Sequence, residues 1–524
     1  MQPRYVLPAR EPARTINLET KPKQVDAWVL RLPLSNPAEA AEELADYLAT
    51  LNRSDVSHDV RAKVIERLFP VVEDLVGSLR EQYGSLSLPL PAKQRRNAEL
   101  AQRLLMETAD CYKALTLEWL GKRFHLFSGN PVPHYLQRTL LALQSVLEVC
   151  YETHESCPHG LWVDLHQTYN YALRNGLKDV VPEGSKYMLS LEQIYLATLL
   201  MALADPYHFP QSELLWAKDI IARYANLAQL YPADESTKGK AGLFLIEVNT
   251  DTPPRPLARE PHPMNPRWDL LLTTTDLAKH LALVSTHLRG QQDDIEKLGL
   301  PEAARDPAYA TMLRRLKLNW GASLQRMAQR RRHQNGREFE VSFGFKAVHA
   351  QISPPTASDA IVYGSGSHDA PPVPLRCKTV NDSMGGLTLR YSGPGAQIRV
   401  GDVVGMRQGN NVWSIGLVRW FRIPAAGEVF FGVQLLAPQA DAIQLRRLDN
   451  GRLWPGLLLL PNPVTRQAPM LLSLPSAFAP DISAETQTAQ GKHTVKVEKR
   501  LESTPSVDVY RLQLGVAVPP MAGR

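Results

Sequence analysis

Cysteine is scarce in this sequence. The 524 residues contain four cysteines: Cys111, Cys150, Cys157 and Cys377. A scaffold that is held together by disulfides has more cysteines in a much shorter chain. The composition therefore excludes that class of secreted protein and predicts a reducing compartment.

Long apolar runs are missing as well. The most apolar stretch is Ile194–Ala204, whereas a membrane-spanning helix needs about 20 apolar residues. The segment before Trp28 is polar and contains four prolines, so it lacks the apolar part of a signal peptide. We expect a cytoplasmic protein with no membrane span.

Signatures of catalysis are also absent. The sequence has no Gly-x-Ser-x-Gly, no His-Glu-x-x-His and no P-loop lysine. Its carboxylates are numerous, but no pair of them is distinguished by its context. We therefore expect a protein that is not an enzyme and that carries no cofactor.

One short segment contains two thiols and two imidazoles, which are ligands that zinc accepts. The residues are Cys150, His154, Cys157 and His159. Their spacing matches no common zinc module, and Cys150 also belongs to the apolar face of a predicted helix. A structural cluster at a helix end is the preferred interpretation, and no metal site is expected.

The residues that are present indicate a globular chain of about three domains, since 44% are apolar and 21% are charged. Helical periodicity dominates residues 36–325, and Pro70 is expected to break or kink one helix. The clearest apolar face is made by Leu136, Leu140, Leu143, Leu147 and Cys150. Ser190 and Gln193 have the spacing of a capping box. Leu243–Val248 is predicted to be a short strand.

After Arg337 the hydrophobic period changes to two. Phe339, Val341, Phe343 and Phe345 alternate with polar residues and glycine, as in a half-buried strand. Short strands with glycine-containing turns predict a small closed barrel. Its further strands are predicted at 387–391, 403–406, 412–422 and 429–436. Beyond residue 438, strands at 456–460, 469–474, 494–499 and 507–514 form a second, smaller β-unit or an extension of the first.

Five arginines fall within twelve positions ahead of this barrel: Arg326, Arg330, Arg331, Arg332 and Arg337. A local basic run of this kind favours an anionic partner, although arginines at a helix end can also simply complement the helix dipole. Further along, Asn381-Asp-Ser-Met-Gly-Gly386 follows a strand-like segment. By itself this second string is also a good turn sequence.

Together the two elements resemble the signature of the PilZ domain family, which is Arg-x-x-x-Arg ahead of a barrel and then Asp/Asn-x-Ser-x-x-Gly. Asn381, Ser383 and Gly386 fill the second motif. The strings Ile415–Trp420 and Gly432–Leu435 are similar to the late strands of such barrels. The resemblance covers residues 326–438, about a fifth of the chain.

The resemblance implies an antiparallel six-stranded barrel that binds cyclic di-GMP. Arginine has a planar fork of donors that fits phosphate oxygens and the guanine edge, and its flat face can stack on a base. Asn381 and Ser383 would supply short hydrogen-bonding side chains, and Gly386 would let the backbone turn or approach closely. The predicted ligand-binding residues are Arg330, Arg331, Arg332, Arg337, Asn381, Ser383 and Gly386.

The first motif departs from the family spacing. Arg326 and Arg330 have the right separation but lie well ahead of the strand, whereas Arg332 and Arg337 adjoin it but are five apart. Either residues 334–336 contain a one-residue insertion or the cluster is degenerate. Arg332 and Arg337 are the preferred pair, with Arg331 assisting.

The predicted fold is therefore an α+β multidomain chain. An extended or partly disordered segment (1–35) precedes a mainly helical module (36–325), the PilZ-like barrel with its arginine-rich linker (326–438), a β-rich segment (439–514) and a tail (515–524). The predicted function is a receptor or adaptor in which cyclic di-GMP rearranges the helical module, which would hold a protein partner. The alternatives are a scaffold that no longer binds ligand and a nucleic-acid-binding protein. The latter is less favoured because no nucleic-acid module and no aromatics interleaved with the arginines are present.

Overall fold

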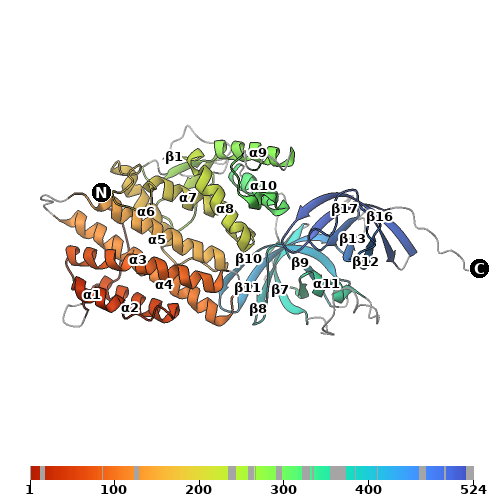
Figure 1. The fold of residues 1–524 in the computed structure, drawn as a ribbon, viewed down its shortest axis with the longest axis horizontal. Helices are drawn as coiled ribbons and strands as arrows, with labels where there is room; N and C mark the ends of the chain where they lie inside the picture. Colours follow the sequence, from red (N-terminus) through yellow and green to blue (C-terminus); the bar gives the residue numbers. More distant parts are fainter. Residues whose placement is uncertain are drawn as a thin grey trace, which may run out of the picture.

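Three units follow one another along the chain, and the first barrel lies between the other two (Figure 1). They are a helical region (residues 2–321), a first barrel (331–437) and a second barrel (441–514). The structure is a computed structural model that describes residues 2–11, 18–84, 87–122, 129–233, 243–257, 265, 267–290, 295, 298–321, 331–332, 336–353, 373–383, 385–409, 411–459, 468–488 and 491–514.

The helical region packs long amphipathic helices around a continuous apolar core. Its helices are α1 (Pro22–Val29), α2 (Pro37–Arg53), α3 (His58–Tyr83), α4 (Ala92–Gly121), α5 (Val132–Thr153), α6 (Leu161–Arg174), α7 (Leu191–Leu203), α8 (Gln211–Tyr224), α9 (Thr275–Gly290) and α10 (Pro307–Gly321), with short 3-10 turns η2 (Pro206–His208), η3 (Ala225–Leu227) and η6 (Glu302–Arg305).

Local sequence signals explain several of these helices. The predicted apolar face of α5 is fully buried, and Ser190 and Gln193 form the predicted capping box at the start of α7. Within residues 1–35, which were predicted to be extended, the structure has the helix α1. Pro22 is tolerated at its first turn because the amide hydrogens there have no helical partner. The sequence predicts a break or a kink at Pro70, and α3 continues through this residue without a break.

A small antiparallel sheet completes the helical region. It contains β1 (Gln229–Pro232), β2 (Leu243–Ile246), β3 (Arg255–Pro256) and β4 (Leu270–Thr273), in the order β1-β4-β2-β3. The strand predicted at Leu243–Val248 is β2. Its four residues are all buried, which places apolar side chains on both faces of the strand.

The first barrel is closed because β8 pairs with both β11 and β7. Six antiparallel strands make the closed ring, as the sequence predicted, and the two-residue strand β5 adds to the edge of β7. The strands are β5 (Arg331–Arg332), β6 (Glu338–Phe343), β7 (Leu375–Ser383), β8 (Gly386–Ser392), β9 (Val403–Arg407), β10 (Ser414–Ala425) and β11 (Glu428–Ala437).

The first strand of the ring is shorter than its sequence pattern predicted. β6 ends at Phe343, and Phe345 instead begins the helix α11 (Phe345–Ile352). Gly344 separates the two elements with a φ of 85°, a conformation that glycine adopts without steric cost. The turn carries Phe345 into an apolar cluster between the two barrels, so its burial does not depend on a strand.

The second barrel is also closed and antiparallel, in the order β12-β13-β14-β17-β16-β15. It has its own apolar core and shares a second cluster with the first barrel. Its strands are β12 (Asp441–Arg447), β13 (Leu453–Leu459), β14 (Met470–Ser473), β15 (Ser483–Thr488), β16 (Gly491–Ser503) and β17 (Asp508–Leu514).

Strand β10 joins the first barrel to the helical region. The imidazole of His154, just past the end of α5, stacks on Phe421 with ring centroids 4.0 Å apart. The His154 ring donates from Nδ1 to the Phe421 carbonyl (3.0 Å), and the Ile423 amide donates to the His154 carbonyl (2.8 Å). Arg422 lies over the ring of Tyr207. Ring stacking and hydrogen bonds to the backbone therefore hold β10 against the end of α5.

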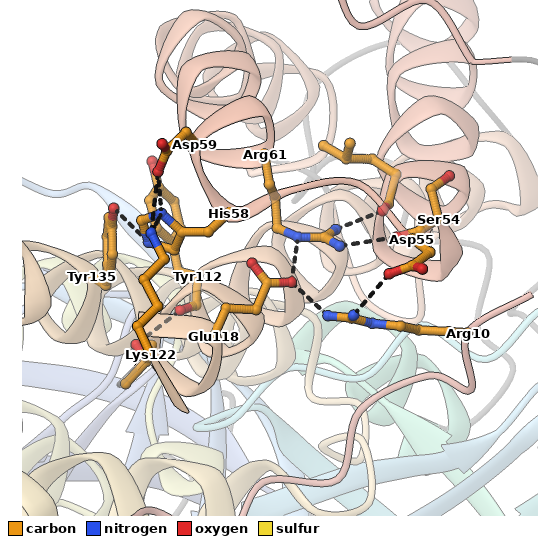
Figure 2. Close-up of polar contacts among 12 residues, drawn as sticks. Arg10, Ser54, Asp55, His58, Asp59, Arg61, Tyr112, Glu118, Lys122 and Tyr135 are labelled. Carbon is orange, nitrogen blue, oxygen red and sulfur yellow. Dashed lines mark hydrogen bonds and ion pairs between the residues drawn. The ribbon is translucent and has the colours of Figure 1, made fainter. Parts of the chain in front are cut away.

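A polar cluster ties the N-terminal segment to the ends of α2 and α4 (Figure 2). Arg61 of α3 is fully buried and donates to the carbonyls of Leu51 (2.6 Å) and Ser54 (3.0 Å), which lie at the end of α2. Its Nε donates to Glu118 (3.1 Å), and Arg10 reaches the same carboxylate (2.5 Å). Arg61 and Glu118 thus join three segments of the helical region, which gives this cluster a structural role. No helix in the described part of the chain is both long and apolar enough to cross a membrane.

Candidate ligand site on the first barrel

The predicted motif lies at a hairpin of the first barrel. Ser383 is the last residue of β7, and Asn381 lies two positions before it, on the same face of the strand. Gly386 is the first residue of β8. The motif therefore belongs to the strands themselves and not to a loop between them. The Ser383 hydroxyl donates to the Gly386 carbonyl (3.2 Å) across the turn.

A row of side chains extends from Asn381 across three more strands. Cross-strand pairing links Asn381 to Thr388, then to Gly432, and then to Trp420. Residues that pair directly across strands lie on the same face of a sheet. Leu389, the next residue after Thr388, is in the barrel core. The row therefore lies on the outer face of the barrel.

A second row runs parallel to the first. Ser383 pairs with Gly386, and Gly386 pairs with Gln434 of β11. Gln434 is exposed, while Asn381 and Ser383 are half-buried. The outer face over β7, β8 and β11 thus presents amide and hydroxyl groups that can hydrogen-bond to a ligand.

Two glycines on this face are required by close packing. A Cβ on Gly386 would lie 2.2 Å from the Val433 carbonyl oxygen, which belongs to the neighbouring backbone. A Cβ on Gly432 would lie 2.1 Å from Nε1 of Trp420, so the indole lies against this glycine. Trp420 keeps part of its surface exposed, and it therefore offers an aromatic surface in the same row as Asn381.

The arginine linker meets the motif through backbone register. In the pairing of β5 with β7, Arg331 lies opposite Asp382 and Arg332 lies opposite Asn381. Further along the same edge of β7, Glu338 lies opposite Lys378. Five residues separate Arg332 from Glu338, whereas two separate Asn381 from Lys378. The extra residues of the linker therefore fall between β5 and β6, and Arg330 lies outside the described residues.

Arg337 reaches the motif through its side chain. Its Nη2 donates to Oδ2 of Asp382 at 2.5 Å, and the two side chains are 50% and 25% exposed. Its backbone is fixed on β7, because its amide donates to Oγ1 of Thr379 (2.7 Å) and its carbonyl accepts from the Thr379 amide (2.9 Å). The guanidinium is therefore anchored on Asp382, the residue between Asn381 and Ser383 in the chain, while still open to solvent.

A further arginine borders the face from β10. Arg419 occupies a β-bulge between Val418 and Trp420, and its Nε donates to the Gln434 side chain (2.7 Å). Its two terminal nitrogens form a bidentate pair with Glu502 of β16. A cavity of about 260 Å³ lies next to this pair, where the helical region and both barrels meet.

The cysteine and histidine cluster does not converge on one point. His154 is buried against Phe421, whereas the side chain of His159 is 99% exposed. The thiol of Cys157 lies 4.0 Å from the hydroxyl of Tyr207. Across the described residues, no group of three or more His, Cys, Asp or Glu side chains could hold a metal ion.

Comparison with known proteins identifies this barrel. Residues 365–442 match the family model of the middle PilZ domain of the cyclic-di-GMP receptor FimW. The first barrel is a PilZ domain. Residues 23–234 match the model of the N-terminal domain of the same receptor, so the helical region in front of the PilZ barrel is similar to that protein as well.

The similarity extends over most of the chain. The cyclic-di-GMP receptor FimW of Pseudomonas aeruginosa is 24% identical to this chain over 522 residues, which cover 84% of this chain and 82% of that protein. No solved structure matches the chain. The chain is therefore similar to a known receptor over most of its length.

Sequence reasoning missed three residues on the outer face of the PilZ barrel: Arg419, Trp420 and Gln434. They fall in the strings Ile415–Trp420 and Gly432–Leu435, which the sequence marked only as late strands. A sequence pattern shows that these strands exist, but the bulge at Arg419 and the register opposite Gly386 come from pairing over long sequence distances. The position of Trp420 opposite Gly432 likewise follows from strand pairing and has no signal in the sequence.

Proposed function

We propose that this protein is a receptor for cyclic di-GMP and that the ligand binds on the outer face of the PilZ barrel. It acts by binding and not by catalysis. The observation that carries the proposal is the register of β5 on β7, which puts Arg331 and Arg332 opposite Asp382 and Asn381. The similarity to FimW supports the choice of ligand, because that protein is described as a cyclic-di-GMP receptor.

The residue types fit the chemistry of the ligand. Cyclic di-GMP has two phosphates and two guanines. Arg332 and Arg337 would bind phosphate oxygens or the O6 and N7 atoms of guanine through paired N–H groups, with Arg331 and Arg330 in supporting positions along the linker. Asn381 and Ser383 would hydrogen-bond from the strand, and Trp420 would stack on a base, an interaction worth about 1–3 kcal/mol.

The test is calorimetric titration with cyclic di-GMP of the wild type and of Arg332→Ala, Arg337→Ala, Ser383→Ala and Trp420→Ala. We expect low-micromolar or tighter binding, weakened about tenfold or more by each arginine change because a charge-assisted bidentate contact is lost. Arg446→Ala is the matched control, since Arg446 is exposed on the second barrel. If the wild type does not bind, the barrel serves as a ligand-independent scaffold.

A titration with single-stranded oligonucleotides at two salt concentrations distinguishes nucleic-acid binding from cyclic di-GMP binding. Binding through the basic run would weaken steeply with salt and would respond to Arg332→Ala only modestly. Binding of the cyclic dinucleotide should instead require the side chain at position 332. This contrast makes the two functions distinguishable with the same variant.

We further propose that ligand binding rearranges the helical region, which would hold a protein partner. Trp420 lies in the ligand row, and its ring centroid is 6.3 Å from that of His208 in the helical region. The helix α10 ends at Gly321, ten positions before Arg331. A ligand that binds the arginines of the linker and Trp420 would therefore act on both of these connections. None of the four cysteines, all of which lie in the described residues, forms a disulfide, in keeping with the proposed cytoplasmic location.

A further inference from the structure

The second barrel supplies an anion to the candidate ligand face. Oε1 and Oε2 of Glu502 accept from Nη1 and Nη2 of Arg419, the second of these bonds at 2.9 Å. This is the bidentate arrangement that a phosphate or a carboxylate makes with arginine. Glu502 lies near the end of β16, so the pair connects the two barrels through side chains.

Arg419 is held at the edge of the ligand face. Its Nε donates to Gln434, and Gln434 pairs with Gly386 of the motif. Ser383 and Arg419 are thus three strand spacings apart, about 14 Å. A ligand with two bases and two phosphates that contacts Ser383 and Trp420 would bring negative charge next to Arg419, because Trp420 follows it in the chain.

The electrostatic setting keeps Glu502 ionised. Burial by itself would raise the pKa of this carboxyl, but its hydrogen bond with Arg419 and the charges of Arg419, Arg315 and Arg314 hold the pKa below its usual value. The side chains of Arg419 and Glu502 are only 30% and 23% exposed, so solvent screens their attraction less than it would on an open surface.

We propose that Glu502 is an internal competitor that occupies Arg419 until a phosphate of the bound ligand takes its place. This inference rests on the proposed function and adds a regulatory role for the second barrel. The pair between Arg419 and Glu502 lowers the affinity for ligand, because the pair must break before the ligand can contact Arg419. By linkage, ligand binding weakens the pair at the end of β16 by the same free energy.

The rest of the contact between the barrels would survive this exchange. Thr504 donates to the Gly401 carbonyl (3.0 Å), and the Ser506 hydroxyl donates to Asp402. The ligand would therefore free the segment around Glu502 and leave these nearby anchors in place. The structural signal would be local, confined to the end of β16.

The experiment compares Glu502→Gln with Glu498→Gln in the intact chain. Glu498 lies on the same strand and is exposed, which makes it the matched control. We expect Glu502→Gln to bind cyclic di-GMP about fivefold more tightly, at the lower end of couplings between sites, and Glu498→Gln to bind like the wild type. In an Arg419→Ala background, Glu502→Gln should leave the affinity for cyclic di-GMP unchanged, because Glu502 no longer has an arginine at position 419 to pair with.

Hydrogen exchange provides an independent readout. Ligand should increase exchange at Leu501–Ser503 in the wild type and leave exchange at these positions unchanged in Glu502→Gln, where the pair is already weakened. Thermal unfolding of each variant checks that the barrels remain folded. If the wild type binds and Glu502→Gln binds equally or more weakly, the competitor role is wrong while the receptor stands. If neither the wild type nor Glu502→Gln binds, the receptor is wrong and the competitor role fails with it.

Discussion

A residue that is proposed to bind the ligand can also have a structural role in the barrel. Gly386 belongs to the motif, and the resemblance implies that this glycine lets the backbone turn or approach closely. In the structure the space for a side chain is taken by the neighbouring strand, with the Val433 carbonyl oxygen 2.2 Å from an added Cβ. A loss of binding on mutation of Gly386 would therefore not identify it as a ligand contact.

Gly386→Ala is expected to destabilise the barrel by about 1–3 kcal/mol, because backbone atoms must shift to admit the methyl group. Gly385→Ala is the control, since an added Cβ there meets nothing within 4 Å, and its effect should stay within about 0.5 kcal/mol. Urea unfolding measures both changes. Equal stability of the two variants would contradict the packing role of Gly386.

At the scale of elements, sequence patterns worked where packing is local. The apolar face of α5 and the capping box of α7 depend on residues three or four positions apart, and both predictions are confirmed. The pattern failed at Phe345, whose burial comes from contact with the second barrel and not from β6. Of the break or kink predicted at Pro70, the break does not occur, since the packed face of α3 outweighs one missing backbone hydrogen bond.

The buried Arg61 of α3 hydrogen-bonds to backbone carbonyls at the end of a different helix, α2. The carbonyls at the end of α2 have no helical partner, and Arg61 satisfies two of them while pairing with Glu118. Arg61→Met should therefore cost about 3–5 kcal/mol, the usual loss when one member of a buried pair is removed. Arg67→Met on the same helix should cost at most about 1 kcal/mol, since Arg67 forms an exposed pair.

Chemical denaturation of both variants at neutral pH tests this expectation. Adding Glu118→Gln to Arg61→Met should recover part of the lost stability, because a buried carboxylate without its arginine is removed. If Arg61→Met changes the free energy of unfolding by less than about 1 kcal/mol, then solvent or Arg10 takes over the hydrogen bonds of Arg61 at the end of α2.

For the whole molecule, the sequence predicted the order of the units but not how they meet. The resemblance located the barrel and the motif from residues that are close in the chain. The joint at β10 depends on His154 and Phe421, which are 267 positions apart, and no local pattern connects them. For the same reason the link between Arg419 and Glu502 had no signal in the sequence.

This joint should weaken in acid. Burial lowers the pKa of His154 to about 4, against the hydrogen bonds to the Phe421 and Phe209 carbonyls, and the charges of His208 and Arg422 lower it further. The unfolded chain binds a proton near pH 6.5, so the stabilising effect is complete above that pH and is lost as the pH falls towards 4. From these two pKa values, the loss at pH 5 is about 2 kcal/mol.

His154→Asn removes this titration and keeps a residue type that tolerates the left-handed conformation. Its change in unfolding free energy between pH 7.5 and pH 5.0 should be smaller than that of the wild type by about 2 kcal/mol. His287→Asn, on the exposed surface of α9, should behave like the wild type. The same pH dependence in all three proteins would rule out a contribution from His154.

The end of α5 also affects the orientation of the helical region relative to the PilZ barrel. His154 has φ and ψ of 56° and 22°, so the chain turns there through a left-handed residue, and the same residue then carries the ring and the carbonyl that hold β10. These two backbone dihedrals therefore help to set the orientation of the helical region against the PilZ barrel, together with contacts such as the hydrogen bond from the Ile398 amide to the Leu88 carbonyl. A substitution that moved this residue out of the left-handed region would displace the ring and the carbonyl together, and so change two of the contacts that hold β10.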